Sequence, residues 1–511
     1  MLWLSVLLAG AAAALAGLLH FRQPLQSETF FVEADPPVPV ERVRLASRNS
    51  FPVHFLLLHG YVANRRQLLH LAQVLAASGG DVYVMDLPGR GDHRGRASPL
   101  PEDGPMAQLP TPLESEAALA VVHHLERRLG ITRERLVLIG HSTGGGVAVD
   151  IARRLLPAAT VLLSSLERPV APGLPPNLLI ITARFDFPPL LRAAERMFEQ
   201  AGSDSAGRRE FLAWHSSLPY HEAVQQAIVE WTTRALPGAA LRIPPYFNLE
   251  LLVLEWAALL LLASLVWPLG RLAAWALAQE PLGEIVPESR LALWTPPQLA
   301  GFAFACGGVV VAALALLRWQ KWPLPLDFLR LGEGGYLATV FFLSIFGVLW
   351  VHRRLPWVRS PRESAARTAA ALALALYVVA ACGGFITWQI FDVWPTPGRL
   401  ARLPVLLLLF LPYAFGEELL VRAYSPPAAD RELSGLLLWR VPLLAAITAG
   451  AFFLGTGAGL LVVMTLPLVA LTVVEHSFAS TLRSSLESVY GVAVFRAVFL
   501  AWLFAASFPL R

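Results

Sequence analysis

One short segment of the 511-residue chain has the residue types and spacing of a nucleophile site. The run Leu136-Val-Leu-Ile-Gly-His-Ser-Thr-Gly-Gly-Gly146 joins an aliphatic strand pattern to G-x-S-x-G and a small-residue helix start. A serine on such a tight turn projects outward, and Gly140 and Gly144 leave room for strand and helix to meet. Unpaired N–H groups at a helix start favour developing negative charge. Ser142 is therefore predicted to be a nucleophile in acyl transfer, the alternative being a merely tight glycine-rich turn.

The elements that must position this serine are short apolar runs that alternate with helical patterns. The pairs are Phe51 to Leu58 then Arg65 to Ala77, Val82 to Leu87 then Leu113 to Leu129, and Leu136 to Ile139 then Gly144 to Leu155. Further strands are expected at Thr160 to Leu163, Leu178 to Thr182 and Glu210 to Trp214. This rhythm predicts a mostly parallel sheet with helices on both faces. Reactive groups then belong on loops at the carboxyl ends of the strands.

The segment from about Val53 to Trp231 resembles the α/β-hydrolase superfamily. Besides the serine turn, Leu56-Leu-Leu-His-Gly-Tyr61 is similar to the family's His-Gly loop, and Asp86-Leu-Pro-Gly-Arg-Gly-Asp92 to its glycine-rich turn after the next strand. The resemblance implies a nucleophile elbow containing Gly140, His141 and Gly144. It also implies an oxyanion hole formed by the backbone amides of Tyr61 and Thr143.

The family order of nucleophile, acid and histidine guides the choice of the other catalytic residues. Asp186 closes the run Leu178 to Asp186 and fits the acid, the alternative being a capping aspartate. Two histidines compete as the base. His215 directly follows a strand pattern and is favoured, whereas His221 opens the final helix. Neither a metal site nor a cofactor is predicted.

Composition excludes a wholly soluble protein. The chain is 55% hydrophobic and only 15% charged, and its mean hydropathy is +0.54, whereas ordinary soluble domains are about a quarter charged. No arginine-rich block with interleaved aromatics indicates nucleic-acid binding. The expected organisation is an N-terminal transmembrane anchor at residues 1–20, a hydrolase domain at 27–235, a linker at 236–248, and a multi-pass all-α transmembrane domain at 249–511.

About eight spans of bilayer length are expected in the last part of the chain. They are Leu249 to Trp267, Leu299 to Leu317, Tyr336 to Val351, Ala369 to Ile390, Leu403 to Leu420, Leu436 to Leu454, Ala458 to Val474 and Val492 to Phe508. Arginines concentrate in loops that alternation places opposite the hydrolase domain. We therefore expect a multi-pass protein of the cell membrane with an extracytoplasmic hydrolase domain.

Only about fourteen residues separate the strands ending near Leu163 and starting near Leu178, too few for a large helical cap. The expected activity is that of an open, membrane-bound serine hydrolase. It is expected to cleave carboxylic esters, thioesters or lipid acyl bonds, with the bilayer as partner.

The membrane half contains ionisable residues that count as functional candidates. Phe415-Gly-Glu-Glu-Leu-Leu-Val-Arg422 places Glu418 and Arg422 on one helical face, and His476 ends a later span. The E-E-x-x-x-R string resembles the first motif of the CAAX-prenyl protease and bacteriocin-processing family. That family has two further histidine-bearing motifs, while this region offers only His476. The alternatives are a degenerate relative of that fold and a structural ion pair at the helix end.

Two other functions remain open at this point. The first is a membrane scaffold or transporter with a vestigial hydrolase domain, in which Ser142 is unreactive. The second makes the membrane half the active part through Glu417, Glu418 and His476. Such an activity would survive Ser142→Ala.

Overall fold

The computed structural model divides the chain into two compact units. The sheet unit comprises residues 14–258 and the helical unit residues 259–384 and 395–508, with short terminal and internal segments assigned to each. The structure describes residues 25–98, 112–165, 177–277, 295–319, 364–384, 400–424, 429–453, 458–486 and 488–507, with breaks at 49, 62, 203–205 and 246, and isolated positions elsewhere.

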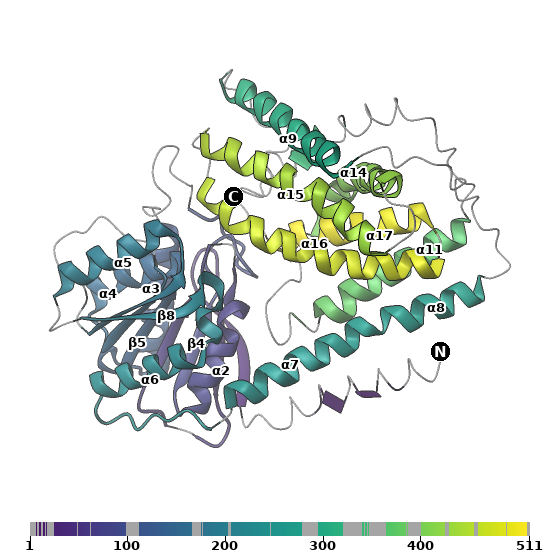
Figure 1. Ribbon diagram of the computed structural model, residues 1–511. Helices are drawn as coiled ribbons and strands as arrows, with labels where there is room; N and C mark the ends of the chain where they lie inside the picture. The colour runs from purple at the N-terminus through teal and green to yellow at the C-terminus, as the bar shows by residue number, and fades with distance from the viewer. Residues whose placement is uncertain are drawn as a thin grey trace. The chain divides into compact units, whose positions relative to one another are not determined.

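The sheet unit is built on eight strands in the order β1-β2-β4-β3-β5-β6-β7-β8 (Figure 1). Strands β1 and β2 are antiparallel to each other, β2 is antiparallel to β4, and the remaining pairs are parallel. The bounds are β1 Leu25–Val32, β2 Val38–Leu45, β3 His54–Leu58, β4 Asp81–Met85, β5 Leu136–His141, β6 Ala159–Leu163, β7 Leu178–Phe185 and β8 Ala206–Trp214.

Helices cover both faces of this sheet. One face packs on α3 (Pro112–Leu129), α4 (Thr143–Leu155) and α5 (Pro188–Ala201), and the other on α2 (Leu69–Ala77) and α6 (Glu222–Ala235). Successive residues of a strand point to opposite faces of the sheet. In β3, Leu56 and Leu58 pack in the core beneath α3, α4 and α5, and Phe55 and Leu57 pack in the core beneath α2 and α6. This alternation with apolar residues at every position is typical of a strand buried on both sides.

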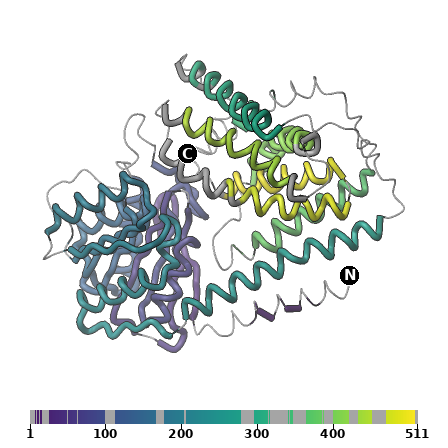
Figure 2. Tube along the Cα trace, viewed as in Figure 1, coloured from purple at the N-terminus to yellow at the C-terminus, as the bar shows by residue number. Residues whose placement is uncertain are grey.

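The mostly parallel sheet with helices on both faces is confirmed. From β3 to β6, strands and helices alternate along the chain as expected, and Figure 2 shows the path of the chain through this unit. Strands β1 and β2 were not expected. They lie at one edge of the sheet, and β1 is largely exposed, so the periodic apolar signal of a buried strand is weak there. The segment between β6 and β7 falls largely outside the described residues.

The helical unit contains long apolar helices. Six segments are long and apolar enough to cross a membrane, judged by length and composition among the described residues: Phe247–Ala276, Pro296–Ala313, Ala365–Gly383, Leu403–Leu420, Glu432–Gly450 and Val489–Ala506. The helices are α7 Phe247–Ser264, α8 Val266–Ala276, α9 Pro296–Trp319, α11 Ala365–Tyr377, continued by a π-helical turn η6 Val378–Gly383, α14 Leu403–Tyr424, α15 Ala429–Phe453, α16 Ala458–Leu486 and α17 Val489–Ser507.

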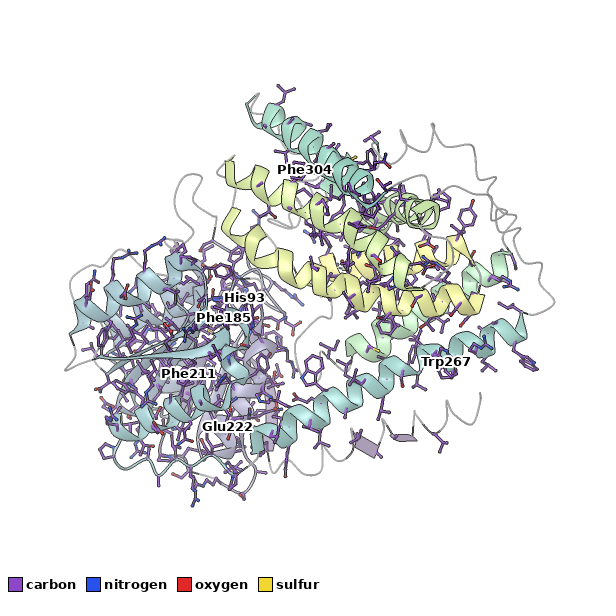
Figure 3. The ribbon with its side chains drawn as sticks, in the orientation of Figure 1. His93, Phe185, Phe211, Glu222, Trp267 and Phe304 are labelled. Carbon is purple, nitrogen blue, oxygen red and sulfur yellow. The ribbon has the colours of Figure 1, made fainter. Side chains whose placement is uncertain are left out.

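These six segments coincide with six of the eight expected spans. The expected span at Ala458 to Val474 falls in helix α16. The expected spans at Leu2 to Leu19 and Tyr336 to Val351 lie largely outside the described residues. Trp267 and Phe304, labelled in Figure 3, are 45% and 55% exposed on α8 and α9. Large exposed apolar side chains suit a lipid environment.

Candidate active site

Ser142 lies between the end of β5 and the start of α4, with φ 54° and ψ −119°. Positive φ is uncommon for a residue with a side chain and is tolerated where the surroundings impose it. Here the turn is confined by close backbone contacts. A Cβ on Gly144 would lie 2.2 Å from the Leu58 carbonyl oxygen, and one on Gly140 would lie 2.3 Å from the Gly144 carbonyl oxygen. Both positions therefore require glycine, as the G-x-S-x-G pattern predicts.

Asp186 and His215 meet at the ends of β7 and β8. His215 Nδ1 lies 2.9 Å from Asp186 Oδ1, which also accepts a hydrogen bond from the Phe187 amide at 2.8 Å. The Asp186 side chain is fully buried and that of His215 is 16% exposed. Burial by itself would raise the pKa of Asp186, but the hydrogen bond and charge of His215 outweigh it and lower this pKa. Asp186 is thus a charged partner for an imidazolium.

His141 holds the backbone of His215. Because a carbonyl only accepts, His141 Nε2 donates to the His215 carbonyl oxygen, at 3.0 Å. The two imidazole rings lie 4.9 Å apart. Burial, with a smaller effect from His215, lowers the pKa of His141 to about 3. His141 is therefore neutral, and because it directly precedes Ser142 it connects the Ser142 turn to the backbone of the predicted base, His215.

The alternative base, His221, lies elsewhere. It precedes α6 and packs against the Phe211 ring at 5.8 Å, while its Nδ1 is buried without a hydrogen-bond partner among the described residues. Its described contacts do not include Asp186. The geometry favours His215 as the histidine that faces the acid.

The His-Gly loop after β3 lies next to Ser142. A Cβ on Gly60 would be 3.3 Å from Ser142 Cβ. His59 braces this loop, since its Nδ1 donates to the Gly60 carbonyl at 2.8 Å and its Nε2 accepts from the Leu87 amide at 3.0 Å. Tyr61 follows in this loop and is buried, and Thr143 is the first residue of α4. Of the two predicted oxyanion residues, Thr143 thus directly follows Ser142 in the chain, and Tyr61 directly follows Gly60, which lies next to Ser142.

Arg90 is a residue of this site that sequence reasoning missed. Its Nε donates to the Tyr61 carbonyl at 2.6 Å, and its guanidinium lies 4.7 Å from the centre of the Tyr61 ring. A second nitrogen donates to Pro88 O at 2.8 Å and to Glu114 Oε1 at 3.1 Å. The only signal in the sequence was its place in the glycine-rich turn Asp86 to Asp92. Arg90 therefore fixes the backbone of the Tyr61 loop.

An exposed aromatic pair borders the acid and the histidine. Phe185 directly precedes Asp186, Trp214 directly precedes His215, and their ring centres lie 5.0 Å apart. They are 49% and 55% exposed, and Figure 3 labels Phe185 at the end of β7. The Phe187 ring contacts His215 edge-on at 5.6 Å. The rim of the site at this edge is therefore apolar.

Comparison with known proteins agrees with this architecture. Residues 55–294 match the Alpha/beta hydrolase family. The sheet unit thus has the α/β-hydrolase fold, as expected. No curated protein matches the chain.

Among solved structures, a serine hydrolase without lid from Xanthomonas campestris is 17% identical with a TM-score of 0.33, and the match covers 42% of this chain and 96% of that one. An esterase from Pyrobaculum calidifontis is 16% identical with a TM-score of 0.33, covering 45% and 92%. A thermostable esterase from Pseudomonas putida is 16% identical with a TM-score of 0.33, covering 46% and 91%.

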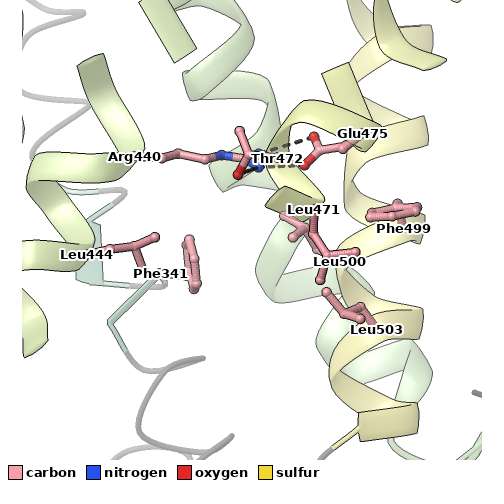
Figure 4. A pocket seen from close by; sticks show the side chains of 9 residues that line it. All are labelled: Phe341, Arg440, Leu444, Leu471, Thr472, Glu475, Phe499, Leu500 and Leu503. Carbon is pink, nitrogen blue, oxygen red and sulfur yellow. Dashed lines mark hydrogen bonds and ion pairs between the residues drawn. The ribbon is translucent and has the colours of Figure 1, made fainter. Parts of the chain in front are cut away.

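Glu417 and Glu418, two of the residues singled out in the helical unit, belong to a buried charge cluster. Arg440 of α15 donates to Glu417 of α14 at 2.7 and 2.6 Å and to Glu475 of α16, and Arg496 of α17 donates to Glu417 at 2.9 Å. Glu418 pairs with Arg483 at 2.6 Å. In Figure 4, Arg440, Thr472 and Glu475 form the polar side of a small, otherwise apolar pocket. The cluster thus joins four helices.

The expected pairing of Glu418 with Arg422 is not tested, because the Arg422 side chain lies outside the described residues. The described ion pairs of Glu418 reach α16 and α17. His476 is buried and its Nδ1 has no hydrogen-bond partner among the described residues. The family match ends at residue 294, before this motif, and nothing in the comparisons supports the CAAX-protease resemblance. Among the described residues, no group of three or more metal-binding side chains could hold a metal ion.

Proposed function

We propose that the sheet unit is a serine hydrolase that cleaves carboxylic ester or thioester bonds, including those of lipids. Ser142 is the nucleophile, His215 the base and Asp186 the acid. The observation that carries the proposal is the 2.9 Å contact between His215 and Asp186, at the same edge of the sheet as the strained Ser142 turn. In parallel sheets, this edge is where loops assemble a site.

The mechanism follows from these positions. His215 takes the Ser142 hydroxyl proton while Ser142 Oγ bonds to the acyl carbon. The amides of Tyr61 and Thr143 stabilise the resulting oxyanion. The tetrahedral intermediate expels the alcohol or thiol, which receives the proton from His215. Water then attacks the acyl-enzyme with His215 again as base, which releases the acid and regenerates Ser142.

Among the described residues, no hydrogen bond joins Ser142 Oγ to His215. Such contacts are often long until substrate binds. The proposed catalytic step therefore requires the two side chains to come into hydrogen-bond contact when substrate binds. The His141 bond to the His215 carbonyl limits how far the backbone can move.

We also propose that the enzyme is a multi-pass membrane protein with the sheet unit outside the cytoplasm. The six long apolar helices support the membrane location, and the arginine distribution of the short loops supports the orientation. A membrane-impermeant carboxyl reagent applied to intact cells should modify exposed carboxylates of the sheet unit, such as Glu210 of β8. Modification only after the cells are lysed would show that the sheet unit lies on the cytoplasmic side, opposite to the proposal.

The first experiment is labelling of the detergent-solubilised full chain with a fluorophosphonate probe. We expect wild type and Ser264→Ala to be labelled and Ser142→Ala not. Ser264 is a matched control because its hydroxyl is exposed and, among the described residues, donates to the Leu261 carbonyl of its own helix α7. Labelling that persists in Ser142→Ala would disprove the assignment of the nucleophile. An unlabelled wild type would favour a vestigial hydrolase domain.

A further inference from the structure

Helix α7 begins the first of the six apolar segments, yet its first turns carry two buried polar residues. Asn248 Oδ1 accepts a hydrogen bond from His70 Nε2 of α2 at 2.6 Å. Glu255 Oε2 lies 3.6 Å from Nδ1 of the same histidine. Asn248 and Glu255 are two helical turns apart and so share a face. His70 is completely buried, and the other two residues are 6% and 1% exposed. All three belong to the sheet unit.

These residues are not required for crossing a bilayer. The apolar segment Phe247–Ala276 has 30 residues, whereas about 20 suffice for a span. Burial of a carboxylate, an amide and an imidazole is unfavourable unless their partners compensate. Leu249 and Trp256, on the same stretch of α7, are more than half exposed. The polar face of the first turns is therefore a specific contact with α2.

His70 connects α7 to two segments of the candidate site, the short helix that begins with His215 and the loop that contains Gly60. Its ring lies 5.3 Å from the ring of Tyr220, the last residue of the short 3-10 helix η4 (His215–Tyr220), which His215 begins. The Tyr220 hydroxyl donates to the Gln67 carbonyl at 3.1 Å. The Gln67 side chain in turn accepts from the Gly60 amide at 3.4 Å, and Gly60 adjoins Ser142.

We infer that the first turns of α7 are a positioning element of the active site. Asn248 and Glu255 fix the His70 ring, and His70 with Tyr220 fixes the segment that carries His215 and the loop that carries Gly60 and Tyr61. The described contacts of these residues do not include the side chains of Ser142, Asp186 or His215, so the role that we assign to them is positioning. The inference rests on the proposed function in so far as it assigns His215 as the base.

The test uses the full chain in detergent with three variants of α7. Asn248→Leu removes the acceptor for His70. Asn248→Asp keeps an oxygen there, and an acidic residue is favourable in the first turn of a helix. Glu250→Gln is the matched control, since Glu250 is exposed on the same helix. For a soluble ester, we expect Asn248→Leu to lower kcat about tenfold with KM within twofold. Asn248→Asp should stay within threefold of wild type, and Glu250→Gln should equal it.

Hydrogen exchange provides a readout that does not depend on activity. In Asn248→Leu, peptides covering residues 60–69 and 215–220 should exchange severalfold faster than in wild type, with peptides of β5 and β6 unchanged. If Asn248→Leu does not fold, Glu255→Gln should show a smaller change in the same peptides. Wild-type exchange in these peptides would overturn the inference, as would an unchanged kcat. If wild type neither hydrolyses esters nor reacts with the probe, the proposed function fails, and exchange alone decides the positioning role.

Discussion

His215 Nδ1 and Asp186 Oδ1 lie 2.9 Å apart although 29 residues separate them in the chain. The contact forms because β7 and β8 are parallel neighbours and their carboxyl ends reach the same edge of the sheet. The same Asp186 oxygen accepts the Phe187 amide. The acid therefore has little freedom to turn, and it holds the imidazole by its Nδ1 side.

Asp186→Asn should retain this oxygen but remove its charge. We expect kcat for a soluble ester to fall about a thousandfold, because the imidazolium formed during attack loses its compensating carboxylate. KM should change less than threefold. Glu210→Gln is the control, since Glu210 is an exposed carboxylate on β8. A variant with near wild-type kcat would remove Asp186 from the catalytic residues.

Arg90→Lys should weaken the oxyanion loop. Lysine lacks the planar guanidinium group, which in Arg90 donates hydrogen bonds to the Tyr61 and Pro88 carbonyls and to Glu114 at the same time. We expect kcat to fall about 10- to 100-fold with little change in KM, comparable to or smaller than the loss of one oxyanion donor. Arg234→Lys is the control, because Arg234 also stacks on an aromatic ring but is exposed. Equal effects of the two substitutions would contradict a specific role for Arg90.

Stability should fall as the pH drops below about 6.5. Burial lowers the pKa of His59 well below its ordinary value, and those of His93 to about 4 and His141 to about 3. Below pH 6.5 the unfolded chain binds protons at these sites and the folded chain does not. Each histidine therefore contributes a loss of up to about 1.4 kcal/mol per pH unit until its folded pKa is reached. The lowered pKa of Asp186 adds a further loss only below about pH 4.

The measurement is the thermal midpoint of the detergent-solubilised protein from pH 8 to pH 4.5. His93→Gln should reduce the pH dependence below pH 6.5 by about a third. His123→Gln should leave it unchanged, because the His123 side chain is 46% exposed. A midpoint that does not change between pH 7 and pH 5 would show that the buried histidines are protonated without loss of structure.

Arg440→Leu should destabilise the helical unit. It removes the main partner shared by Glu417 and Glu475, and breaking a buried pair costs about 3–5 kcal/mol. We expect a lower yield of monodisperse protein and a lower unfolding midpoint. Adding Glu475→Leu should recover part of the loss, since Glu417 retains Arg496. Arg271→Leu, at an exposed position of α8, should have no such effect. Normal stability of Arg440→Leu would contradict a structural role for the cluster.

The parts of the fold that follow local rules could be predicted from the sequence. The Ser142 turn is one, because the G-x-S-x-G pattern lies between its own strand and helix and the glycine at 140 is required by contact with Gly144 of the same turn. Gly144 in addition meets Leu58 and His59, which are distant in the sequence. The buried strands are another, since each is a continuous apolar run. Strands β1 and β2 were missed because neither is a continuous apolar run: β1 is an edge strand that is largely exposed, and the sequence of β2 is interrupted by Glu41, Arg42 and Arg44.

The remaining features depend on residues far apart in the chain. His215 and His221 both follow β8, and only the packed structure decides which one faces Asp186. Glu418 contacts Arg483, 65 residues away, a partner that the spacing along its own helix could not indicate. Asn248 was assigned to a linker, but its partner His70 is 178 residues away. Helical periodicity carries no information about such partners.

The polar contact of α7 with α2 also determines where this protein can be divided. The proline-rich stretch from Leu236 to Tyr246 is the obvious cutting point in the sequence, yet a fragment ending there would leave His70 without Asn248 and Glu255. The structural boundary between the units instead falls inside helix α7, near Ala258. A truncation or gene fusion at the linker would therefore remove two partners of a buried histidine, whereas one made near Ala258 would keep them. The first turns of α7 thus belong with the sheet unit, although the sequence alone would place them with the membrane helices.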